Sequence, residues 1–481
     1  MFEGLLLTAD RLVGGGFDRT VRANHRRRLR RVGWKRALDA PAGGWAGGPP
    51  PPRQGNDVRI LIDGAAALGE MAAQMGRAHS HVHLTGWHFS PDFALTRGED
   101  PVVLRNLLAD LAERIDVRVL VWAGAPLPVF RPSRRAVAGM RDVLVRRSRV
   151  RCERDALERP LHCHHDKTIV IDDRVAFVGG IDLTYLAGDR YDTPAHRARA
   201  QVGWHDGAAR IEGPAVTDVA EHFRMRWWEV TGETLPAPAS AGPAGPVELQ
   251  VVRTVPNGIY RSLPSGDFRI LESYLRALRS ARRLVYLENQ FLWSPEIVDV
   301  LADKLRNPPG DGFRLLVVLP SKPNSGADDS RGQVSALIDA DDGAGRFLAC
   351  TLTARDRDRA DPVYVHAKIG IVDDEWLTIG SANLNEHSLF NDTEMNVVTH
   401  DPGLARATRL RLWAEHLELG EGDVGGPPAQ VFDERWRPTA KEQLARQDAG
   451  RPLTHRLVEL RGTSRHSRRL LGPVDGLLVD G

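Results

Sequence analysis

The sequence contains the same series of elements twice, and this internal repeat constrains the fold more than any other feature. Each copy holds a helix-like run, an apolar strand candidate ending in Ser-Pro, a second apolar strand candidate, a hairpin-like motif, a short strand and a helical stretch. Two copies of one such unit predict a duplicated architecture. Because strand and helix patterns alternate, we expect an α/β fold with mixed sheets flanked by helices and two lobes related by a pseudo-twofold axis.

Stretches rich in Gly and Pro divide the chain, since these residues break both helices and strands. One such stretch, GGWAGGPPPPRQG, precedes the first copy, and another, LPAPASAGPAGP, separates the two copies. The predicted division is an N-terminal arm at 1–56, a first lobe at 57–234, a linker at 235–246, a second lobe at 247–420 and a C-terminal tail at 421–481.

The strongest chemical signal is the motif His-x-Lys-x4-Asp-x6-Gly-Gly/Ser, which occurs once in each copy with identical spacing. Its members are His165, Lys167, Asp172, Gly179 and Gly180, and then His366, Lys368, Asp373, Gly380 and Ser381. The residues after each Lys are strand-like, so each His and Lys is expected at i and i+2 on one strand face. The Asp-Asp pair that follows predicts a turn and hence a β-hairpin. A glycine after the hairpin lets the backbone approach a bound oxyanion.

Two motifs brought together supply the groups that phosphodiester cleavage needs. A neutral imidazole attacks phosphorus, and a protonated imidazole donates to the departing alcohol. Two ammonium groups bind the non-bridging oxygens. A lone His-x-Lys on a strand is usually a surface pair, whereas two copies inside a wider repeat favour one shared catalytic site.

Composition narrows the class of protein. With 65 basic and 63 acidic residues the formal net charge is +2, which argues against a dedicated nucleic-acid binder. The three cysteines, Cys152, Cys163 and Cys350, do not form a disulfide framework. There is no secretory signal pattern and no run of eighteen apolar residues. We therefore expect a cytoplasmic protein, with peripheral attachment to the inner membrane surface as a second expectation.

The basic run at residues 25–36 is the candidate contact with anionic phospholipid, and a solvated arm is the competing interpretation. In the tail, SRHSRR offers a similar but weaker signal. The HCHHD stretch at 162–166 does not predict a metal site, because strand alternation would place its side chains on opposite faces. No Gly-rich nucleotide loop is present, so no cofactor is expected.

The paired motifs resemble the phospholipase D superfamily, and the similarity covers roughly residues 57–420. It is closer to the eukaryote-like branch than to the small nucleases. The stretches that carry it beyond the motifs are GGIDLTYLAGDRYDTPAH, GWHDGAARIEGPAVTDVAEHFRMRWWEV, VYLENQFL and GSANLNEHSLFNDTEMNVV. Two departures stand out: His387 occupies a position where the family commonly has Arg, and the lipid-binding domains that often precede the catalytic part are missing.

The resemblance implies roles for individual residues. His165 would be the nucleophile and His366 the general acid. Glu394 would orient His165, and Asp206 would orient His366. The repeat supports this pairing, because Asp206 and Glu394 each precede a proline by eight residues. Asn383 is expected to contact the phosphate with support from Ser381, and the first-copy counterparts are Asp182 and Gly180. Asp172 and Asp373 are expected to shape the turns.

The expected reaction is metal-free hydrolysis of a phospholipid to phosphatidic acid through a phosphohistidine. A phosphatidyltransferase of the cardiolipin synthase kind would share that intermediate. A nuclease is a second alternative, and an inactive lipid-binding module is a third. The expected partners are a phospholipid substrate and an anionic membrane surface, without nucleic acid. A monomer is expected because the two lobes take the place of a dimer.

Overall fold

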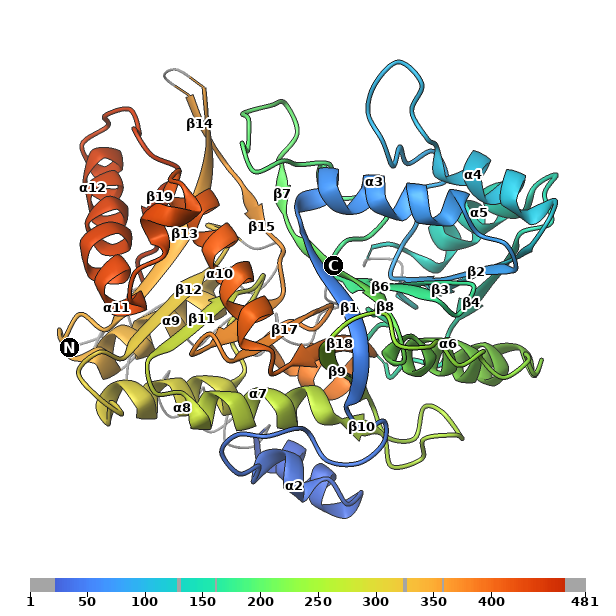
Figure 1. Cartoon of the computed structure of the whole chain (residues 1–481), viewed down its shortest axis with the longest axis horizontal. Coiled ribbons are helices and arrows are strands. Elements are labelled where there is room, and N and C mark those ends of the chain that lie inside the picture. The colour runs from blue at the N-terminus through green and yellow to red at the C-terminus, as the bar shows by residue number, and fades with distance from the viewer. Residues whose placement is uncertain (1–21, 128–130, 161, 323–326, 357–358, 463–481) are drawn as a thin grey trace.

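The computed structural model describes residues 22–127, 131–160, 162–322, 327–356 and 359–462, and its main strands form two matching sheets (Figure 1). The first-lobe sheet has the order β1 (Arg53–Ile62), β8 (Gly207–Glu212), β6 (Val175–Gly179), β5 (Thr168–Ile171), β2 (His81–Gly86), β3 (Asp116–Trp122), β4 (Arg151–Asp155). The second-lobe sheet has the order β9 (Val247–Val255), β18 (Glu394–Thr399), β17 (Trp376–Gly380), β16 (Ile369–Val372), β11 (Leu284–Glu288), β12 (Arg314–Val318), β13 (Phe347–Asp356).

The two sheets also share their strand directions. Neighbours are antiparallel from β1 to β2 and parallel from β2 to β4, and the same sequence of directions runs from β9 to β13. β1 pairs antiparallel with β9 and joins the lobes. The predicted α/β class with duplicated mixed sheets is therefore confirmed.

The helices repeat in the same order and flank the sheets. The first lobe has α3 (Asp63–Gly76), α4 (Leu104–Ala112), α5 (Arg134–Val145) and α6 (Ala215–Thr231), and the second has α7 (Arg269–Ser280), α8 (Pro295–Arg306), α9 (Ala327–Asp341) and α10 (Pro402–Leu417). In Figure 1, α3 lies above the first-lobe sheet and its counterpart α7 lies below the second-lobe sheet. This exchange of sides is what a twofold relation between the lobes produces.

A shared hydrophobic core holds the lobes together. Val178 and Ile211 of the first lobe belong to the same buried cluster as Ile369, Ile379 and Val397 of the second. Each fully buried aliphatic side chain of this kind contributes roughly 1.5–3 kcal/mol. The two motif hairpins, β5–β6 and β16–β17, contribute to this core, so the packing that joins the lobes also fixes the motifs relative to each other.

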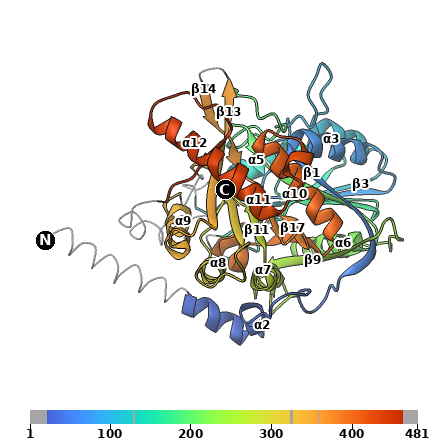
Figure 2. The same cartoon turned by 60° about the vertical axis from the view of Figure 1, so that its left-hand side comes forward.

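The described part of the N-terminal arm packs against the second lobe. Residues 22–31 are helical and are followed by α2 (Lys35–Leu38), which lies along α7 (Figures 1 and 2). Leu29 and Trp34 are buried in the cluster that α7 helps to form. The arm is therefore not the solvated segment considered above, because its apolar residues cover a helix. Arg26, Arg27 and Arg30 are exposed, whereas Arg28 is partly buried and donates to the second lobe. Residues 1–21 lie outside the described part.

The expected tail is also built into the second lobe. Its elements are η2 (Glu421–Val424), α11 (Pro428–Val431), η3 (Phe432–Trp436), α12 (Arg437–Asp448) and β19 (Leu457–Glu459). β19 pairs antiparallel with β13, and Phe432 and Trp436 are fully buried. The repeat could not predict this, because these elements have no counterpart in the first copy. SRHSRR lies outside the described residues.

Several short elements complete the fold. They are β7 (Trp204–His205), β10 (Asp267–Phe268), β14 (Arg359–Pro362), β15 (Tyr364–Val365) and the π-helical turn η1 (His387–Asn391). Residues 235–244 of the predicted linker have no regular structure. Within the ranges given above, no helix combines the length and apolar character needed to cross a bilayer.

Candidate active site

Each repeated motif forms the predicted hairpin. β5 pairs with β6, and β16 pairs with β17 in the equivalent register. The turn residues Asp172, Asp173, Asp373 and Asp374 have φ between 53° and 58°. Asp tolerates this left-handed region better than most residues, which explains the Asp-Asp pair in both turns.

The turn aspartates also secure the neighbouring strands. The Asp172 carboxylate accepts backbone N–H bonds from the residues that lead into β2, 79–81, at 2.8 to 3.0 Å. Asp373 accepts three from residues 282–284, which lead into β11, each at 2.7 Å. Both residues therefore brace two strands at once, in keeping with their predicted structural role.

The position of the motif histidines differs from the expectation. β5 begins at Thr168 and β16 at Ile369, so His165, Lys167 and their counterparts precede the strands instead of projecting from them. The physical reason is that the backbone before each strand pairs with the opposite lobe. The pattern of apolar residues could not reveal this, because it reports only on the strand itself.

The two motif segments dock on opposite lobes in the same way. The backbone N–H groups of His165 and the next residue both donate to the carbonyl oxygen of Thr393, at 2.8 and 2.9 Å. The N–H groups of His366 and the next residue donate to the carbonyl oxygen of His205, at 2.8 and 3.1 Å. Each catalytic candidate is thus held by backbone bonds that cross between the lobes.

The two predicted histidine–carboxylate pairs are present, and both cross between the lobes. His165 Nδ1 lies 2.9 and 3.1 Å from the two carboxylate oxygens of Glu394, and His366 Nδ1 lies 2.6 Å from Asp206 Oδ2. All four side chains are buried. A carboxylate accepting from Nδ1–H fixes the tautomer in which Nε2 carries the lone pair, so each ring presents Nε2 to a substrate.

The supports of the two carboxylates differ. Glu394 accepts bonds from the hydroxyls of Ser381, at 2.5 Å, and Ser388, at 2.6 Å. Asp206 accepts from the backbone N–H of Gly207 at 2.7 Å. At Gly180, the position equivalent to Ser381, a Cβ would lie 2.2 Å from Asp206 Oδ1. Gly180 therefore makes room for a carboxylate of the site, which differs from the expected approach of its backbone to substrate.

The two lysines turn back toward their own histidines. Lys167 Nζ donates to the carbonyl oxygen of His165 at 2.8 Å, and Lys368 Nζ donates to that of His366 at 2.5 Å. Lys167 also forms an ion pair with Asp182 at 3.1 Å. The first-motif ammonium therefore has an anionic partner within hydrogen-bond distance.

The second-motif lysine meets an amide in the equivalent place. Lys368 Nζ donates to Gln290 Oε1 at 3.1 Å, and Asn383 Nδ2 donates to the same oxygen at 3.3 Å. The Oδ1 atom of Asn383 is buried without a hydrogen-bond partner. Asn383 and Asp182 thus occupy matching places beside the two lysines, as the repeat predicted.

Burial and nearby cations act together on the second histidine. Burial lowers the pKa of His366 well below its usual range, and the charges of Lys368, Arg190 and Lys167 lower it further. Burial raises the pKa of Asp206 to about 7. The buried pair can thus hold one proton near neutral pH, and an anion among the cations would favour the ring as its location.

Besides Ser388, which bonds to Glu394, two residues of the site near His366 had been missed. Arg190 is buried and stacks on Trp204, with the guanidinium carbon 3.3 Å from the ring centroid, and Trp204 in turn packs 4.4 Å from the ring of His366. Arg190 lies in the quoted stretch that follows the first motif, and Trp204 lies two residues before Asp206. Their place in those stretches was the available signal, but neither stands in a repeated motif.

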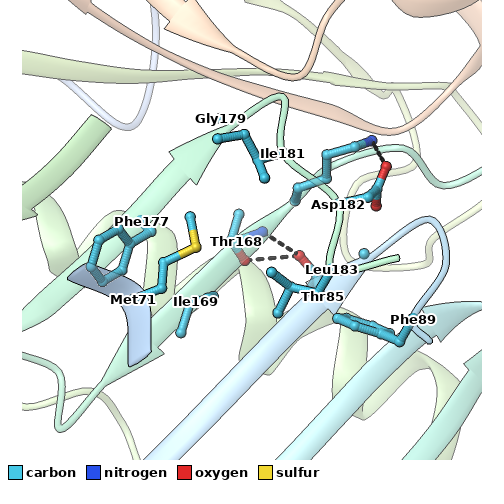
Figure 3. Close-up of a pocket in the computed structure, with 12 residues that line it drawn as sticks. Met71, Thr85, Phe89, Thr168, Ile169, Phe177, Gly179, Ile181, Asp182 and Leu183 are labelled. Atoms are coloured by element: carbon cyan, nitrogen blue, oxygen red, sulfur yellow. Dashed lines mark hydrogen bonds and ion pairs between the residues drawn. The ribbon is translucent and has the colours of Figure 1, made fainter. Parts of the chain in front are cut away.

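Figure 3 shows a small cavity behind the first motif. Its volume is about 20 Å³, close to the space that one water occupies. Thr85 Oγ1 lies 2.8 Å from Thr168 Oγ1 on its wall, and the Asp182–Lys167 ion pair lies at its edge (Figure 3). The cavity is a packing gap beneath the motif and is too small to hold a phospholipid.

The HCHHD stretch is not a strand, and His162 and His164, which alternation would have placed on one face, have different partners. His164 lies 3.0 Å from Asp155, whereas the Nδ1 atoms of His162 and His387 lie 3.0 Å apart, with His162 Nδ1 3.4 Å from Asp392. His387, the residue that departs from the family pattern, thus contacts the first motif's flank. The Cys163 side chain is buried in a cluster with Trp87 and Trp122, and its backbone N–H donates to Asp392 Oδ1 at 2.9 Å.

The comparisons with known proteins agree with this geometry. The Phospholipase D family model matches residues 347–449. The chain is 24% identical to "Phospholipase D A" of Dictyostelium discoideum, over 77% of this chain and 36% of that protein. It is 24% identical to "Phospholipase D2" of Bos taurus, over 81% and 56%. It is 25% identical to "Phospholipase D alpha 2" of Oryza sativa subsp. japonica, over 61% and 54%. The chain therefore spans about a third to just over half of these relatives.

Among solved structures, the phosphatidylserine synthase of Haemophilus influenzae Rd KW20 is similar to this chain. The TM-score is 0.52, the sequence identity is 11%, and the match covers 88% of this chain and 98% of that chain. At this identity the likeness concerns the fold, and it agrees with the mixed α/β architecture described above.

Proposed function

Because the chain belongs to the phospholipase D superfamily, we propose that it hydrolyses a phospholipid at the bond between the phosphate and the head-group alcohol. The products are phosphatidic acid and the free alcohol. The observation that carries the proposal is the pair of buried histidines, each bonded through Nδ1 to a carboxylate of the opposite lobe. The names of the curated relatives support phospholipid as the substrate class.

In the first step, Nε2 of His165 attacks phosphorus and forms a P–N bond. The P–O bond to the head group breaks, and the alkoxide takes a proton from Nε2 of His366. Glu394 stabilises the positive charge that develops on the His165 ring. The product of this step is a phosphatidyl-histidine at His165 together with the free head-group alcohol.

In the second step, His366 acts as the base. It takes a proton from water, the oxygen of that water attacks phosphorus, and the P–N bond breaks. His165 is regenerated, and phosphatidic acid leaves. His366 then carries the proton that the next substrate needs, so the cycle closes without a net proton change on the protein.

The cations of the site suit a phosphate that gains negative charge in the transition state. Lys167, Lys368 and Arg190 are all buried, so their charges act in a low-dielectric environment. Asn383 contributes its amide beside Lys368, with Ser381 acting indirectly through Glu394. A bound phosphodiester anion also favours protonation of His366, so binding of the substrate prepares the general acid.

The identity of the group that accepts the phosphatidyl moiety, water or an alcohol, is tested by incubating the full chain with mixed phospholipids, with and without a primary alcohol. Phosphatidic acid in water, and phosphatidyl-alcohol at its expense when alcohol is added, are expected. Cardiolipin made from phosphatidylglycerol without phosphatidic acid would instead favour a phosphatidyltransferase. Cleavage of single-stranded DNA without turnover of phospholipid would contradict the proposal.

We propose further that the enzyme acts as one bilobal monomeric unit at the cytoplasmic membrane surface. Arginines on the outer face of the helix at 22–31 are exposed, and each basic residue near an anionic bilayer contributes about 1 kcal/mol. Cosedimentation with phosphatidylglycerol vesicles tests this contact. Substitution of Arg26, Arg27 and Arg30 by Ser should weaken binding to the vesicles. Substitution of Arg146, Arg147 and Arg149, a matched exposed set on the first lobe, should not.

Equal loss from both arginine sets, or no loss from either, would contradict a membrane contact through the helix at 22–31. Neither outcome bears on the chemistry at the histidines. Light scattering of the same protein tests the proposed monomeric state. A dimer in dilute solution would show that the second lobe does not take the place of a partner subunit.

A further inference from the structure

A second buried cluster lies behind Asp206 and has no part in the chemistry above. Asp63, His196, His205 and Glu415 converge there from both lobes. Asp63 opens α3, His196 lies in the loop before β7, His205 is in β7, and Glu415 is in α10 of the second lobe. The first three are at most 1% exposed, and the Glu415 side chain is 6% exposed. This cluster is defined as the interlobe cluster.

Four separations between nitrogen and carboxylate oxygen atoms of the interlobe cluster lie near the spacing of ligands around one small metal ion. His205 Nδ1 lies 2.9 Å from Asp63 Oδ1 and 3.3 Å from Glu415 Oε1. His196 Nε2 lies 3.0 Å from Glu415 Oε1 and 4.0 Å from Asp63 Oδ2. Ligands about 2.0–2.1 Å from a tetrahedral zinc ion are separated by about 3.3–3.4 Å, which is the middle of this range.

Each histidine of the interlobe cluster has an outer carboxylate on its far nitrogen. Asp192 Oδ2 lies 2.9 Å from His196 Nδ1, and Glu288 Oε2 lies 2.7 Å from His205 Nε2. Metal-bound imidazoles are commonly oriented by a carboxylate that accepts from the nitrogen facing away from the metal. The rings therefore already direct His196 Nε2 and His205 Nδ1 toward the common centre.

The Oδ2 atom of Asp63 is buried and has no hydrogen-bond partner. It lies 4.0 Å from His196 Nε2, beyond hydrogen-bond distance. A buried carboxylate oxygen left without a bond is costly in an apolar interior. The orphaned oxygen faces the same centre as the other ligand atoms, which points to a group that the protein itself does not supply.

We propose that the interlobe cluster binds one divalent transition-metal ion, of the zinc class, in a tetrahedral site made of two imidazole nitrogens and two carboxylate oxygens. Four ligands of this kind suit zinc, whereas calcium takes six to eight oxygen ligands and magnesium keeps several waters. No open coordination position remains, so the role is structural. The phosphoryl transfer at His165 needs no metal and is independent of this site.

The ion would cross-link the two lobes beside the active site. The backbone N–H of Asp63 donates to the carbonyl oxygen of Asp206 at 2.8 Å, and the carbonyl oxygen of His205 holds the second motif. Glu415 brings α10 of the second lobe to the same point. Metal binding would therefore fix the segment that carries Asp206, the carboxylate partner of His366.

The test uses the full chain with any purification tag removed. Metal analysis of the purified protein should find about one zinc ion per chain. After stripping with a chelator, one equivalent of Co²⁺ should restore binding and give the intense visible absorption of a tetrahedral site. Failure of the stripped, folded protein to bind either ion at stoichiometric concentration would overturn the proposal and leave a purely proton-linked network.

Variants locate the metal. His196→Asn and Glu415→Gln should abolish the cobalt spectrum, whereas His83→Asn should not. His83 is the matched control, because it is also a buried histidine with a carboxylate partner, Asp116, in the first lobe. Asp192→Asn keeps all four ligands and should weaken the affinity about 10–100-fold, so it tests the site even if a ligand variant fails to fold.

Two other groups are competing locations: His162 with His387 and Asp392, and His205 with Glu288 and His416. A cobalt spectrum that survives unchanged in His196→Asn but disappears in His162→Asn or in His416→Asn would overturn the proposal. Because the spectrum is read without substrate, this outcome is distinguishable from any failure of the proposed phospholipase activity.

Discussion

The two lobes have the same framework but support their catalytic carboxylates differently. In the second lobe, Glu394 accepts bonds from two serine hydroxyls as well as from His165. In the first lobe, Asp206 accepts one backbone N–H besides the His366 bond, and Gly180 takes the place of a serine. Lys167 faces an aspartate, whereas Lys368 faces a glutamine. The repeated parts thus bring His165 close enough to His366 for its charge to lower the pKa of that ring, and the unrepeated parts give the two imidazoles different environments.

This difference suits the different roles of the two histidines, nucleophile and proton donor. Burial raises the pKa of Glu394 as well, but Glu394 accepts bonds from two serine hydroxyls and from His165, and it stabilises positive charge on His165 while that ring attacks. An Asp206 with a pKa near 7 shares a proton with His366, which must both give and take one. Duplication alone would make two equivalent histidines, so the asymmetry in these supports is what the following experiments probe.

The largest effect is expected from removing the nucleophile. His165→Asn should lower kcat by about 10⁶-fold, as for loss of a catalytic-triad nucleophile, with a natural phospholipid and with a phosphatidyl-nitrophenol alike. His366→Asn should lower kcat with the natural substrate by a similar factor. It should not prevent release of nitrophenolate in the first turnover, since that leaving group needs no proton. Loss of that first-turnover release in His366→Asn and its retention in His165→Asn would reverse the two roles.

Neutralising the two carboxylates is expected to lower kcat by smaller and unequal factors. Glu394→Gln should lower kcat by about 10⁴-fold, the cost of losing the anion that orients a catalytic imidazole. Asp206→Asn should cost less, about 10²-fold, because its carboxyl group is partly neutral near pH 7. Steady-state kinetics at saturating substrate compare them. Equal losses, or a larger loss at Asp206, would mean that the two supports are functionally equivalent.

The next largest loss of kcat is expected from changes at Gly180 and Ser381, the equivalent positions that differ between the lobes. Gly180→Ala places a Cβ 2.2 Å from the former position of Asp206 Oδ1 and should displace that carboxylate, lowering kcat by about 10²-fold. Ser381→Ala removes one of two hydroxyl bonds to Glu394 and should cost about 10-fold. Circular dichroism and thermal melts serve as controls for folding. A harmless Gly180→Ala would show that Asp206 is not confined by this contact.

The smallest expected effect is a shift in titration. The positive charge of Lys368 helps to lower the pKa of His366, so Lys368→Met should raise it. At a given pH below neutrality, a larger fraction of the ring is then protonated in the variant than in the unmodified protein. NMR of ring-labelled histidine measures this. Lys304→Met is the control, because Lys304 of α8 donates to the backbone carbonyls of Arg279 and Ala281, at the end of α7. Identical titration in Lys368→Met and the unmodified protein would contradict the electrostatic account.

Much of the framework could be predicted from the sequence because it is repeated. Identical spacing around His165 and His366 predicted the hairpins, and equal spacing before Pro214 and Pro402 supported the pairing of Asp206 and Glu394 with the opposite histidines. Repetition supplies an internal alignment, so a residue in one copy can be checked against its counterpart.

The features without a counterpart were missed. Arg190, Ser388 and Trp204 contribute through the tertiary arrangement of loops, which has no periodic pattern. The arm and tail were separated from the lobes on composition, yet Trp34 and Trp436 are buried in the second lobe. A strand pattern also could not reveal that His165 precedes β5, because the pairing of that segment is with Thr393 of the other lobe.

The central claim, that one histidine attacks the phosphorus while its mate from the other lobe transfers the proton, is tested most directly by trapping the intermediate. His366→Asn is mixed with phosphatidyl-nitrophenol labelled in the phosphate, quenched within one turnover and mapped by peptide analysis. We predict one label per chain on His165, and no label when His165→Asn is added to His366→Asn. Label on any other residue, or nitrophenolate released with no labelled histidine, would contradict the account.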